Sequence, residues 1–369
     1  MWEPLVDDFD VAYLYGKSNE FDPGQLKLRP VEIKTRRDRL PKGRLGEFAT
    51  GAIGDDYVGL EAVLGEFDIV HSAELSFWFS SSVARARAAG GNFKAVSTVW
   101  ETIPFLDAFR NRHARRFRAD TLEGTDLFLA ATARAEAALR LEGVPADKIE
   151  VCPPGIDIER FGGVRTEPPS EHVILSPGRL VWEKGHQDVL RAVAALRDGV
   201  VGNPIPPPRL VLMGRGPEEE RLLAHARELG LEDRVEVRSA PYDEMPTVYA
   251  QASCMVLASL PKAGNGFHTF DIPRVFWEEQ FGLVFAEGMA AGLDIITTWS
   301  GAIPEVVGDS ASYFAPGDWL ELAQLLRDGP LSRLPGTRVE HPRERVERYS
   351  IPAVGARFAD VYRRLLSSQ

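Results

Sequence analysis

Short apolar runs alternate with amphipathic stretches along most of the chain. The apolar runs predict β-strands at residues 11–15, 68–71, 93–99, 126–131, 173–175, 209–213, 234–238, 254–258 and 294–298. The amphipathic stretches predict helices at residues 77–89, 133–142, 185–197, 218–229 and 353–366. The alternation is clearest in the second half of the chain, where it predicts a doubly wound α/β domain.

Proline-rich segments divide the chain into two parts. Pro153 and Pro154 stop regular structure, and Pro168 and Pro169 follow soon afterwards. We therefore expect one domain over residues 1–160 and a second over 161–350. A chain of 369 residues is long enough for each to have a sizeable core.

The stretch 277–292, WEEQFGLVFAEGMAAG, carries two carboxylates at Glu279 and Glu287. Between them, Gly282 opens an apolar, Ala-rich helix. The free N–H groups of a first helical turn, here those of Gly282, Leu283 and Val284, favour an anion. A phosphate at the helix start and a sugar hydroxyl on Glu287 would hold a nucleotide. The alternative is an amphipathic core helix with two solvated glutamates.

Composition and charge exclude several classes of protein. A net charge of −11 argues against general nucleic-acid binding. The acidic start does not resemble a signal peptide, and no run of 18 apolar residues exists, so we expect a cytoplasmic protein. Cys152 and Cys254 are expected to be buried free thiols. The Asp8-Phe9-Asp10 sequence is interpreted as a solvated turn, and no metal site is predicted.

Two basic clusters lie in the N-terminal half of this acidic chain. They contain Lys34, Arg36, Arg37, Arg39, Lys42 and Arg44, and then Arg110, Arg112, Arg115, Arg116 and Arg118. One interpretation is attraction to an anionic acceptor or peripheral contact with a lipid surface. The other, which we favour, is a solvated helix face.

Five short motifs occur in an order and at spacings typical of one family. Besides the glutamate pair, they are Pro154-Gly155-Ile156-Asp157, Gly178-Arg179-Leu180 with Lys184-Gly185, Gly214-Arg215-Gly216-Pro217, and Gly301-Ala302-Ile303-Pro304-Glu305. Together they cover residues from about 125 to 320. In these motifs the chain resembles the retaining "group 1" glycosyltransferases (family four).

The resemblance implies a GT-B fold, in which two Rossmann-like domains face each other across a cleft. It also implies that the helix within 351–369 crosses back to the first domain. By comparison with the family, the N-terminus is expected to lack the first strand and its Gly-rich loop. The implied reaction is metal-independent transfer of a hexose, with retention, from a UDP- or GDP-linked donor to an acceptor hydroxyl. UDP-glucose is the default donor, and no cofactor is implied.

The same resemblance assigns roles to residues of the second half. Glu287 would hold the ribose hydroxyls and Glu279 the hydroxyls of the donor sugar. Arg179 and Lys184, which follow a predicted strand, would join the N–H groups of the helix start in an electrostatic clamp for the diphosphate. Arg238, at the end of another strand, is a candidate for contact with the base.

In the first half, polar residues follow two predicted strands. His71 ends one strand and Glu74 follows it, while Glu101 follows the next. Because ligands bind at the carboxyl ends of strands in open α/β sheets, all three are candidates for catalysis on the acceptor side. Many relatives carry His-x-His at the first position, and Ala73 replaces the second His here.

Ala73 and the short N-terminus leave two alternatives open. One is a nucleotide-sugar-binding protein or regulatory subunit that no longer transfers. The other is a sugar-nucleotide epimerase of the same fold. A long loop at residues 260–278, with His268 and Asp271, could help to select the acceptor or the sugar.

Overall fold

The computed structural model describes residues 2–16, 27–41, 43, 45–46, 49, 56–106, 112–164, 166–261 and 277–367. The chain divides into two compact units. Unit 1 contains Met1–Gly155 and Ile351–Gln369, and unit 2 contains Ile156–Ser350. The last helix therefore belongs to the first unit, and unit 2 is formed by one continuous stretch of the chain.

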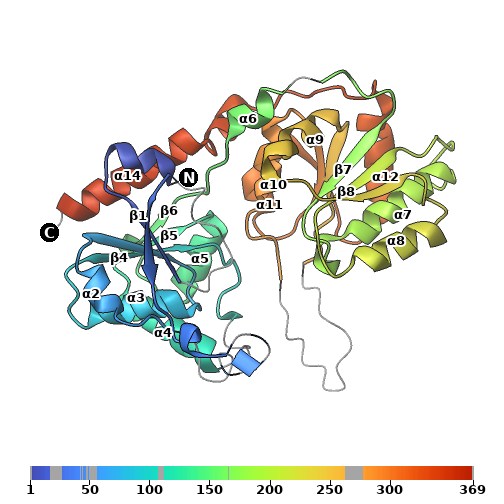
Figure 1. The fold of residues 1–369 in the computed structure, drawn as a ribbon. Coiled ribbons are helices and arrows are strands. Elements are labelled where there is room, and N and C mark those ends of the chain that lie inside the picture. The colour runs from blue at the N-terminus through green and yellow to red at the C-terminus, as the bar shows by residue number, and fades with distance from the viewer. Residues whose placement is uncertain are drawn as a thin grey trace. The chain divides into compact units, whose positions relative to one another are not determined.

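Unit 2 contains a six-stranded parallel sheet with the order β12-β11-β10-β7-β8-β9 (Figure 1). Its strands are β7 Val173–Pro177, β8 Arg209–Met213, β9 Val235–Arg238, β10 Cys254–Leu257, β11 Asp294–Thr298 and β12 Ala311–Phe314. The chain starts at β7 in the middle, builds outward through β8 and β9, and then builds outward from the other side of β7. This is the doubly wound arrangement that the sequence predicted.

Helices cover both faces of this sheet (Figure 1). They are α6 Ile158–Gly162, α7 His186–Arg197, α8 Glu219–Glu228, α9 Met245–Gln251, α10 Leu283–Ala290, α11 Ile303–Val307, α12 Trp319–Asp328 and α13 Arg343–Glu347. Alternate residues of β10 serve the two faces. Cys254 and Val256 join the core formed with α7, α8 and α12, whereas the Met255 side chain lies against Gly288 of α10 on the other face.

Unit 1 contains a four-stranded parallel sheet, β3-β4-β5-β6, and a separate parallel pair, β1-β2. The strands are β1 Ala12–Gly16, β2 Arg29–Ile33, β3 Ile69–Ala73, β4 Lys94–Val99, β5 Leu127–Ala130 and β6 Ile149–Val151. The helices are α2 Leu60–Leu64, α3 Trp78–Ala88, α4 Arg112–Gly124, α5 Ala133–Leu141 and α14 Ile351–Ser367. Strand β2 was not predicted, because Arg29, Pro30 and Glu32 interrupt its apolar pattern.

The last helix, α14, packs into the core of unit 1. Phe358 and Val361 are buried with Val96 of β4, Leu129 of β5 and Leu5 of the 3-10 helix η1 (Glu3–Asp7). The helix begins at Ile351, earlier than predicted, and Pro352 lies in its first turn, where a missing N–H costs little. Among the helices of the described residues, none has the length and apolar character needed to cross a membrane.

Candidate active site

Unit 2 changes its direction of building between β7 and β10. These strands are neighbours, but the chain leaves β7 towards β8 and leaves β10 towards β11. In doubly wound sheets, this switch creates a crevice at the carboxyl ends of the strands. Gly178 and Arg179 follow β7 at this edge, and Ala258 and Ser259 follow β10.

Glu279 is held at this edge by several side chains. Its carboxylate accepts from Lys184 Nζ at 2.6 Å and from Ser259 Oγ at 3.0 Å, both at Oε2. Its own N–H donates to Ser300 Oγ at 3.2 Å. The residue is only 6% exposed, so these polar contacts compensate for its removal from water.

The loop after β11 also holds the backbone of Glu279. The N–H of Ala302 donates to the Glu279 carbonyl at 2.8 Å. Gly301 has a φ of 56°, and a Cβ atom there would clash with the Glu279 carbonyl oxygen. The Gly-Ala-Ile-Pro-Glu motif thus has a local physical role, which is to position Glu279.

Lys184 ends the 3-10 helix η6 (Trp182–Lys184) and is partly enclosed. Its ammonium lies 4.9 Å from the ring centre of Trp277, in addition to its ion pair with Glu279. The next residue, Gly185, has a φ of 71°, and a Cβ atom there would clash with the Ala258 carbonyl. The sequence predicted a cation for phosphate at this position, whereas the structure pairs Lys184 with the carboxylate assigned to the sugar.

The start of α10 presents unpaired backbone donors. Gly282 precedes the helix with a φ of 77°, and no side chain caps the helix. Within the described residues, the N–H groups of Gly282, Leu283 and Val284 have no hydrogen-bond partner. Such groups and the helix dipole favour an anion at this position. The side chain of Leu283 is 38% exposed, so the helix start is accessible.

Arg179 is exposed, and no side-chain partner occurs for it in the part of the chain that the structure describes. The backbone at this residue is fixed by His186, whose Nε2 lies 3.2 Å from the Arg179 carbonyl oxygen. The Nδ1 atom of His186 lies 2.9 Å from Ser176 Oγ. Burial lowers the pKa of His186 to about 4, so the ring is neutral near pH 7. His186 is a positioning residue that the sequence analysis missed.

Glu287 lies in α10 and is buried against α9. The Tyr249 hydroxyl donates to its Oε2 at 2.7 Å. Burial raises the pKa of Glu287, and the Tyr249 hydrogen bond opposes this increase. Burial and the neighbouring Glu287 raise the pKa of Tyr249, so the phenol remains a donor. Among the described residues, Tyr249 is the one hydrogen-bond partner of this carboxylate, which leaves Oε1 available to a ligand.

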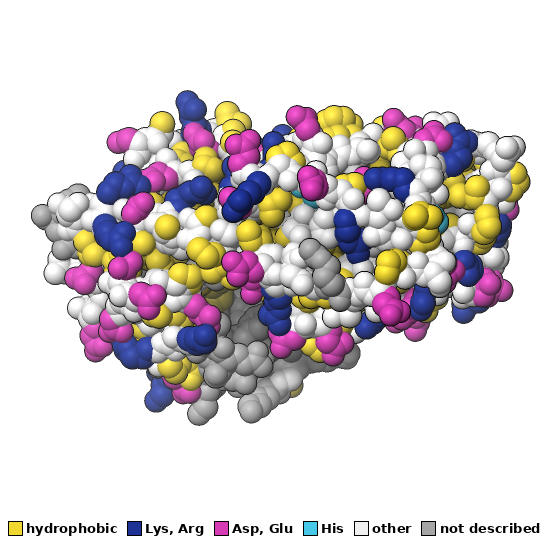
Figure 2. Space-filling view, turned by 90° about the horizontal axis from the view of Figure 1, so that it is seen from above, with side chains coloured by type: hydrophobic (Ala, Val, Ile, Leu, Met, Phe, Trp, Pro, Cys, Tyr) yellow, Lys and Arg dark blue, Asp and Glu magenta, His cyan; other side chains and the backbone are white. Residues whose placement is uncertain are grey.

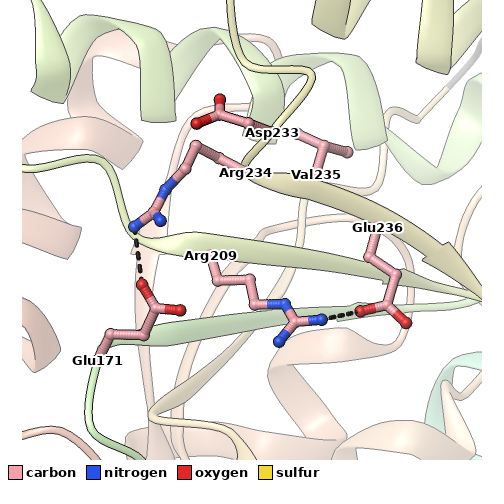
Figure 3. A pocket seen from close by; sticks show the side chains of 6 residues that line it. All are labelled: Glu171, Arg209, Asp233, Arg234, Val235 and Glu236. Atoms are coloured by element: carbon pink, nitrogen blue, oxygen red, sulfur yellow. Dashed lines mark hydrogen bonds and ion pairs between the residues drawn. The ribbon is translucent and has the colours of Figure 1, made fainter.

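Two further features of unit 2 complete the description. Arg238 ends β9 at the outer edge of the sheet, where it is partly exposed. At the opposite, amino ends of β7–β9, a small hollow is lined by Glu171, Arg209, Arg234 and Glu236 (Figure 3). Arg234 pairs with Glu171 at 2.8 Å, and Arg209 pairs with Glu236. Asp233 adds a third carboxylate to the lining, and because both arginines are already paired, the hollow does not favour an anionic ligand.

In unit 1, His71 is tied into the structure by both ring nitrogens. Nδ1 lies 2.6 Å from the Tyr362 hydroxyl of α14, and Nε2 lies 2.7 Å from Thr98 Oγ1 of β4. Trp2 contacts the ring edge-on at 4.7 Å between ring centres. Burial lowers the pKa of His71 to about 3, so it is neutral near pH 7. These contacts indicate a structural role, and its catalytic role stays a prediction.

The two acceptor-side carboxylates are also bound to backbone groups. Glu74 has a φ of 66°, which is unusual for a residue other than glycine, and its Oε1 accepts from the Trp100 N–H at 2.9 Å. Glu101 accepts from the N–H groups of Thr102 at 3.0 Å and Ile103 at 2.9 Å. Their geometry fixes the loops after β3 and β4, and a direct part in catalysis stays a prediction for both.

The basic clusters are partly neutralised. Arg36 pairs with Asp56 at 3.3 Å, Arg118 pairs with Glu142, and Arg116 lies 3.9 Å from Asp120. On the face drawn in Figure 2, positive and negative side chains are interspersed. For the basic clusters themselves, the ion pairs favour the interpretation as a solvated surface. Lys42, Arg44 and Arg110 lie outside the described residues, as do His268 and Asp271.

The cysteine prediction is confirmed, since Cys152 and Cys254 are free and buried. Burial raises the pKa of each thiol to about 12. A search of the described residues for groups of three or more His, Cys, Asp or Glu side chains that could hold a metal gives no candidate. Metal independence itself stays a prediction.

Two parallel α/β units, with the switch point of unit 2 surrounded by the family motifs, define a protein of the GT-B class. Two family models match adjoining parts of the chain. The model described as glycosyl transferases group 1 matches residues 157–329, and the one described as glycosyltransferase family 4 matches residues 25–160. Together the two matches cover most of the chain and support its assignment to the group 1 glycosyltransferases.

Relatives with assigned activities are similar over much of the chain. A GDP-mannose-dependent alpha-(1-6)-phosphatidylinositol monomannoside mannosyltransferase of Mycobacterium tuberculosis is 26% identical over 68% of this chain, which corresponds to 63% of that relative's own length. A D-inositol 3-phosphate glycosyltransferase of Streptomyces bingchenggensis is 27% identical, over 81% of this chain and 67% of the relative.

Solved structures share the fold at low sequence identity. Sucrose-phosphate synthase from Thermosynechococcus elongatus has a TM-score of 0.74 and 20% identity, over 100% of this chain and 92% of the other. HepE of Anabaena, solved in complex with UDP, has a TM-score of 0.68 and 18% identity, over 93% and 87% of the two chains. These similarities support the predicted α/β fold.

Proposed function

We propose that this protein transfers a hexose, with retention and without a metal, from a nucleotide diphosphate sugar to an acceptor hydroxyl. The observation that supports this most strongly is the carboxyl edge of the unit 2 sheet. There a fully positioned carboxylate, Glu279, lies close in sequence to the unpaired N–H groups before and in the first turn of α10. Glu279 can accept hydrogen bonds from sugar hydroxyls, and the N–H groups can donate hydrogen bonds to phosphate. The two kinds of group therefore match the sugar and the diphosphate of a nucleotide sugar.

Each residue of the edge then has a role in holding the donor. The N–H groups of Leu283 and Val284 and the guanidinium of Arg179 bind the diphosphate. The free oxygen of Glu287 accepts from the ribose hydroxyls, and Arg238 contacts the base. Glu279 accepts from hydroxyls of the hexose, while Lys184, held beside it, supplies a positive charge near the leaving phosphate.

The reaction requires stabilisation of the leaving group more than a strong base. The bond between the anomeric carbon and the diphosphate oxygen breaks, and that oxygen carries the new negative charge. A bond from the acceptor oxygen to the same face of the anomeric carbon forms. The acceptor proton passes to the leaving phosphate, so no protein carboxylate has to remove it. Preorganised donors at the phosphate lower the barrier because they need little rearrangement during the reaction.

The donor is proposed as a class that includes both bases. The mycobacterial relative is named for GDP-mannose, and the Anabaena structure contains UDP. The acceptor is proposed to carry a free hydroxyl, and the protein is proposed to work in the cytoplasm. A donor screen with UDP-glucose, UDP-N-acetylglucosamine and GDP-mannose tests the donor class, with thermal stabilisation and donor consumption as two readouts.

The screen should use the wild type, Glu287→Ala and the control Glu232→Ala, which changes an exposed carboxylate of the same unit. We expect one donor to stabilise the wild type and the control but not Glu287→Ala, and to be consumed in the presence of an acceptor. Stabilisation without consumption over a broad acceptor panel would indicate a binding protein. Conversion of the donor to an isomer without any acceptor would indicate an epimerase.

A further inference from the structure

A cavity of about 920 Å³ lies within unit 1, between strands of its two sheets. All five residues of β1 line it, and so do all five residues of β3, from Ile69 to Ala73. Strand β3 is an edge of the four-stranded sheet, and β1 belongs to the separate pair. The cavity therefore occupies the place where a doubly wound sheet would continue by hydrogen bonding from β3 to its neighbour.

The walls of this cavity are strongly aromatic. Eleven Phe, Tyr and Trp side chains line it. Trp2 and Phe358 lie against each other at one end, with 4.8 Å between their ring centres, and Trp78 and Trp100 contribute from segments that follow β3 and β4. Cavities whose lining is mainly aromatic and aliphatic are typical of sites for largely apolar ligands.

Several polar groups in the wall are paired within the protein. His71 is bound through both nitrogens to Tyr362 and Thr98, at 2.6 and 2.7 Å. The ring is neutral near pH 7, because burial lowers its pKa to about 3.

Other polar groups also line the cavity. Asp10 pairs with Arg29 at 3.1 Å, whereas Thr35 Oγ1 is buried without a partner among the described residues. Glu66 and Asp68 add two carboxylates to the lining. The remainder of the wall is mainly aromatic and aliphatic, which suits a hydrocarbon chain.

The cavity is large enough to hold a ligand. Protein interiors are close-packed, and a space of 920 Å³ corresponds to on the order of thirty water molecules. Water in contact with aromatic walls is readily displaced by a ligand that is itself apolar. A hydrocarbon chain that lies along β1 would extend over the five residues of this strand, or about 16 Å.

One end of the cavity lies at the carboxyl ends of β3, β4 and β5, and its position indicates which molecule the hydrocarbon chain belongs to. Ala73, Trp100 and Ala131 line it, and they lie at or just after the ends of β3, β4 and β5. Arg37, an exposed basic residue, also lines it. A chain along β1 would therefore place its polar head at the edge where ligands of α/β sheets bind.

We propose that this cavity binds the hydrocarbon chain of a lipid-linked acceptor, with the head group at the carboxyl edge of the unit 1 sheet. The identification of the chain as part of the acceptor rests on the proposed transfer reaction. Binding of the chain itself does not, because it requires only the cavity.

Tryptophan fluorescence offers a direct test with brominated dodecyl maltoside below its micellar concentration. Bromine quenches tryptophan at short range, and three of the seven tryptophans, Trp2, Trp78 and Trp100, line the cavity. We expect saturable quenching whose amplitude falls when these three are changed individually to Phe. The matched change Trp299→Phe, at a 58% exposed residue of unit 2, should leave the quenching of the other tryptophans unchanged.

A blocking variant tests the location independently. Ala73→Phe places a ring in the cavity, whereas Leu141→Phe adds a ring at a 66% exposed position of α5. We expect at least about tenfold weaker binding for the first variant and unchanged binding for the second. Thermal unfolding would establish that both are folded. If Ala73→Phe does not fold, the tryptophan series still decides the question.

Quenching that does not saturate, or that is insensitive to all three cavity tryptophans, would overturn the proposal. Donor stabilisation should be measured on the same preparations. If the wild type binds a nucleotide sugar but not the brominated chain, only the cavity assignment is wrong. If it binds the brominated chain but no nucleotide sugar, the proposed transfer reaction is wrong and the cavity assignment stands.

Discussion

Polar groups lie at the carboxyl ends of the strands in both sheets, but among the described residues several of them are unpaired in unit 2, whereas the candidate residues of unit 1 are paired. At the carboxyl edge of unit 2, the backbone donors of Leu283 and Val284 and the guanidinium of Arg179 have no partner among the described residues. At the same edge of unit 1, His71, Glu74 and Glu101 are all bound to backbone or to side chains of the same unit. Unpaired polar groups at an accessible strand end indicate a ligand site, whereas paired ones indicate a structural role.

Within unit 2, other residues hold the proposed ligand-binding residues in position. Ser259, Ser300 and Ala302 hold Glu279, and His186 holds the backbone of Arg179. A ligand-binding group gains affinity when its position is fixed before the ligand arrives. The comparison therefore predicts that substitutions at the edge residues of unit 2 change donor binding and turnover, and that those at His71, Glu74 and Glu101 change mainly stability.

The largest effect is expected for Glu279→Gln. This change removes the ion pair with Lys184 and the charge that would accept from the hexose, so donor turnover should fall about 10²- to 10³-fold. Steady-state kinetics would measure the loss, with Glu232→Gln as the control at an exposed position. An unchanged turnover number in a folded Glu279→Gln protein would remove Glu279 from the site.

The next effect is expected for Arg179→Ala. Loss of an unpaired guanidinium should weaken nucleotide diphosphate binding by about 10- to 100-fold, because charge-assisted hydrogen bonds to phosphate are strong. The fold should be retained, since Arg179 is exposed. Titration calorimetry with UDP and GDP would compare it with Arg227→Ala, an exposed arginine of α8. Equal affinities for the two variants would contradict the assignment.

A smaller effect is expected for Tyr249→Phe. The variant keeps the packing of the ring against Phe161 but loses the hydrogen bond to Glu287, which is worth about 1 kcal/mol. Donor binding should weaken about fivefold, and the loss should be smaller in a Glu287→Gln background, where the Tyr249 hydroxyl donates to a neutral oxygen instead of a charged one. Additive losses in the double-mutant cycle would show that Tyr249 acts elsewhere.

Glu287 also predicts a pH dependence of stability. Because burial raises its pKa above the ordinary 4.5, the folded state binds more protons there than the unfolded state. The wild type should therefore lose stability as the pH rises from about 4.5 through the raised pKa, whereas Glu287→Gln should lack this component. Denaturant unfolding at several pH values would reveal it, and parallel curves for the two proteins would contradict the burial argument.

The smallest effect on donor chemistry is expected for His71→Gln. Because this ring joins β3, β4 and α14, the substitution should lower the free energy of unfolding by about 1–3 kcal/mol. Donor hydrolysis per folded molecule should change less than about threefold. A large loss of activity in a stable variant would restore the catalytic role that the sequence suggested.

The sequence predicted most of the strands because their apolar runs are clear, and several of them, such as β7 and β8, are followed by a glycine. Strands β2, β6 and β12 were not predicted. Charged residues and Pro30 interrupt β2, and β6 and β12 are only three and four residues long. Ser259, Ser300, His186 and Tyr249 were missed for another reason. No local pattern connects Tyr249 with Glu287, which lies 38 residues later, and only the packing of α9 on α10 brings them together.

The same limitation explains why the sequence did not predict the ion pair between Lys184 and Glu279. From the sequence, a lysine after a strand and a glutamate before a helix were separate features with separate ligands. The structure places them 2.6 Å apart, although 95 residues separate them along the chain. Spacing can identify candidate groups, but pairing between them depends on strand order.

In the proposed site, the unpaired N–H groups at the start of α10 receive the donor phosphate. Amide hydrogen exchange on the peptide that carries Gly282, Leu283 and Val284, with and without the donor from the screen, would detect this contact. We expect slower exchange there on addition of donor, and much less slowing in Arg179→Ala at the same donor concentration. A donor that binds with unchanged exchange in this peptide would contradict it.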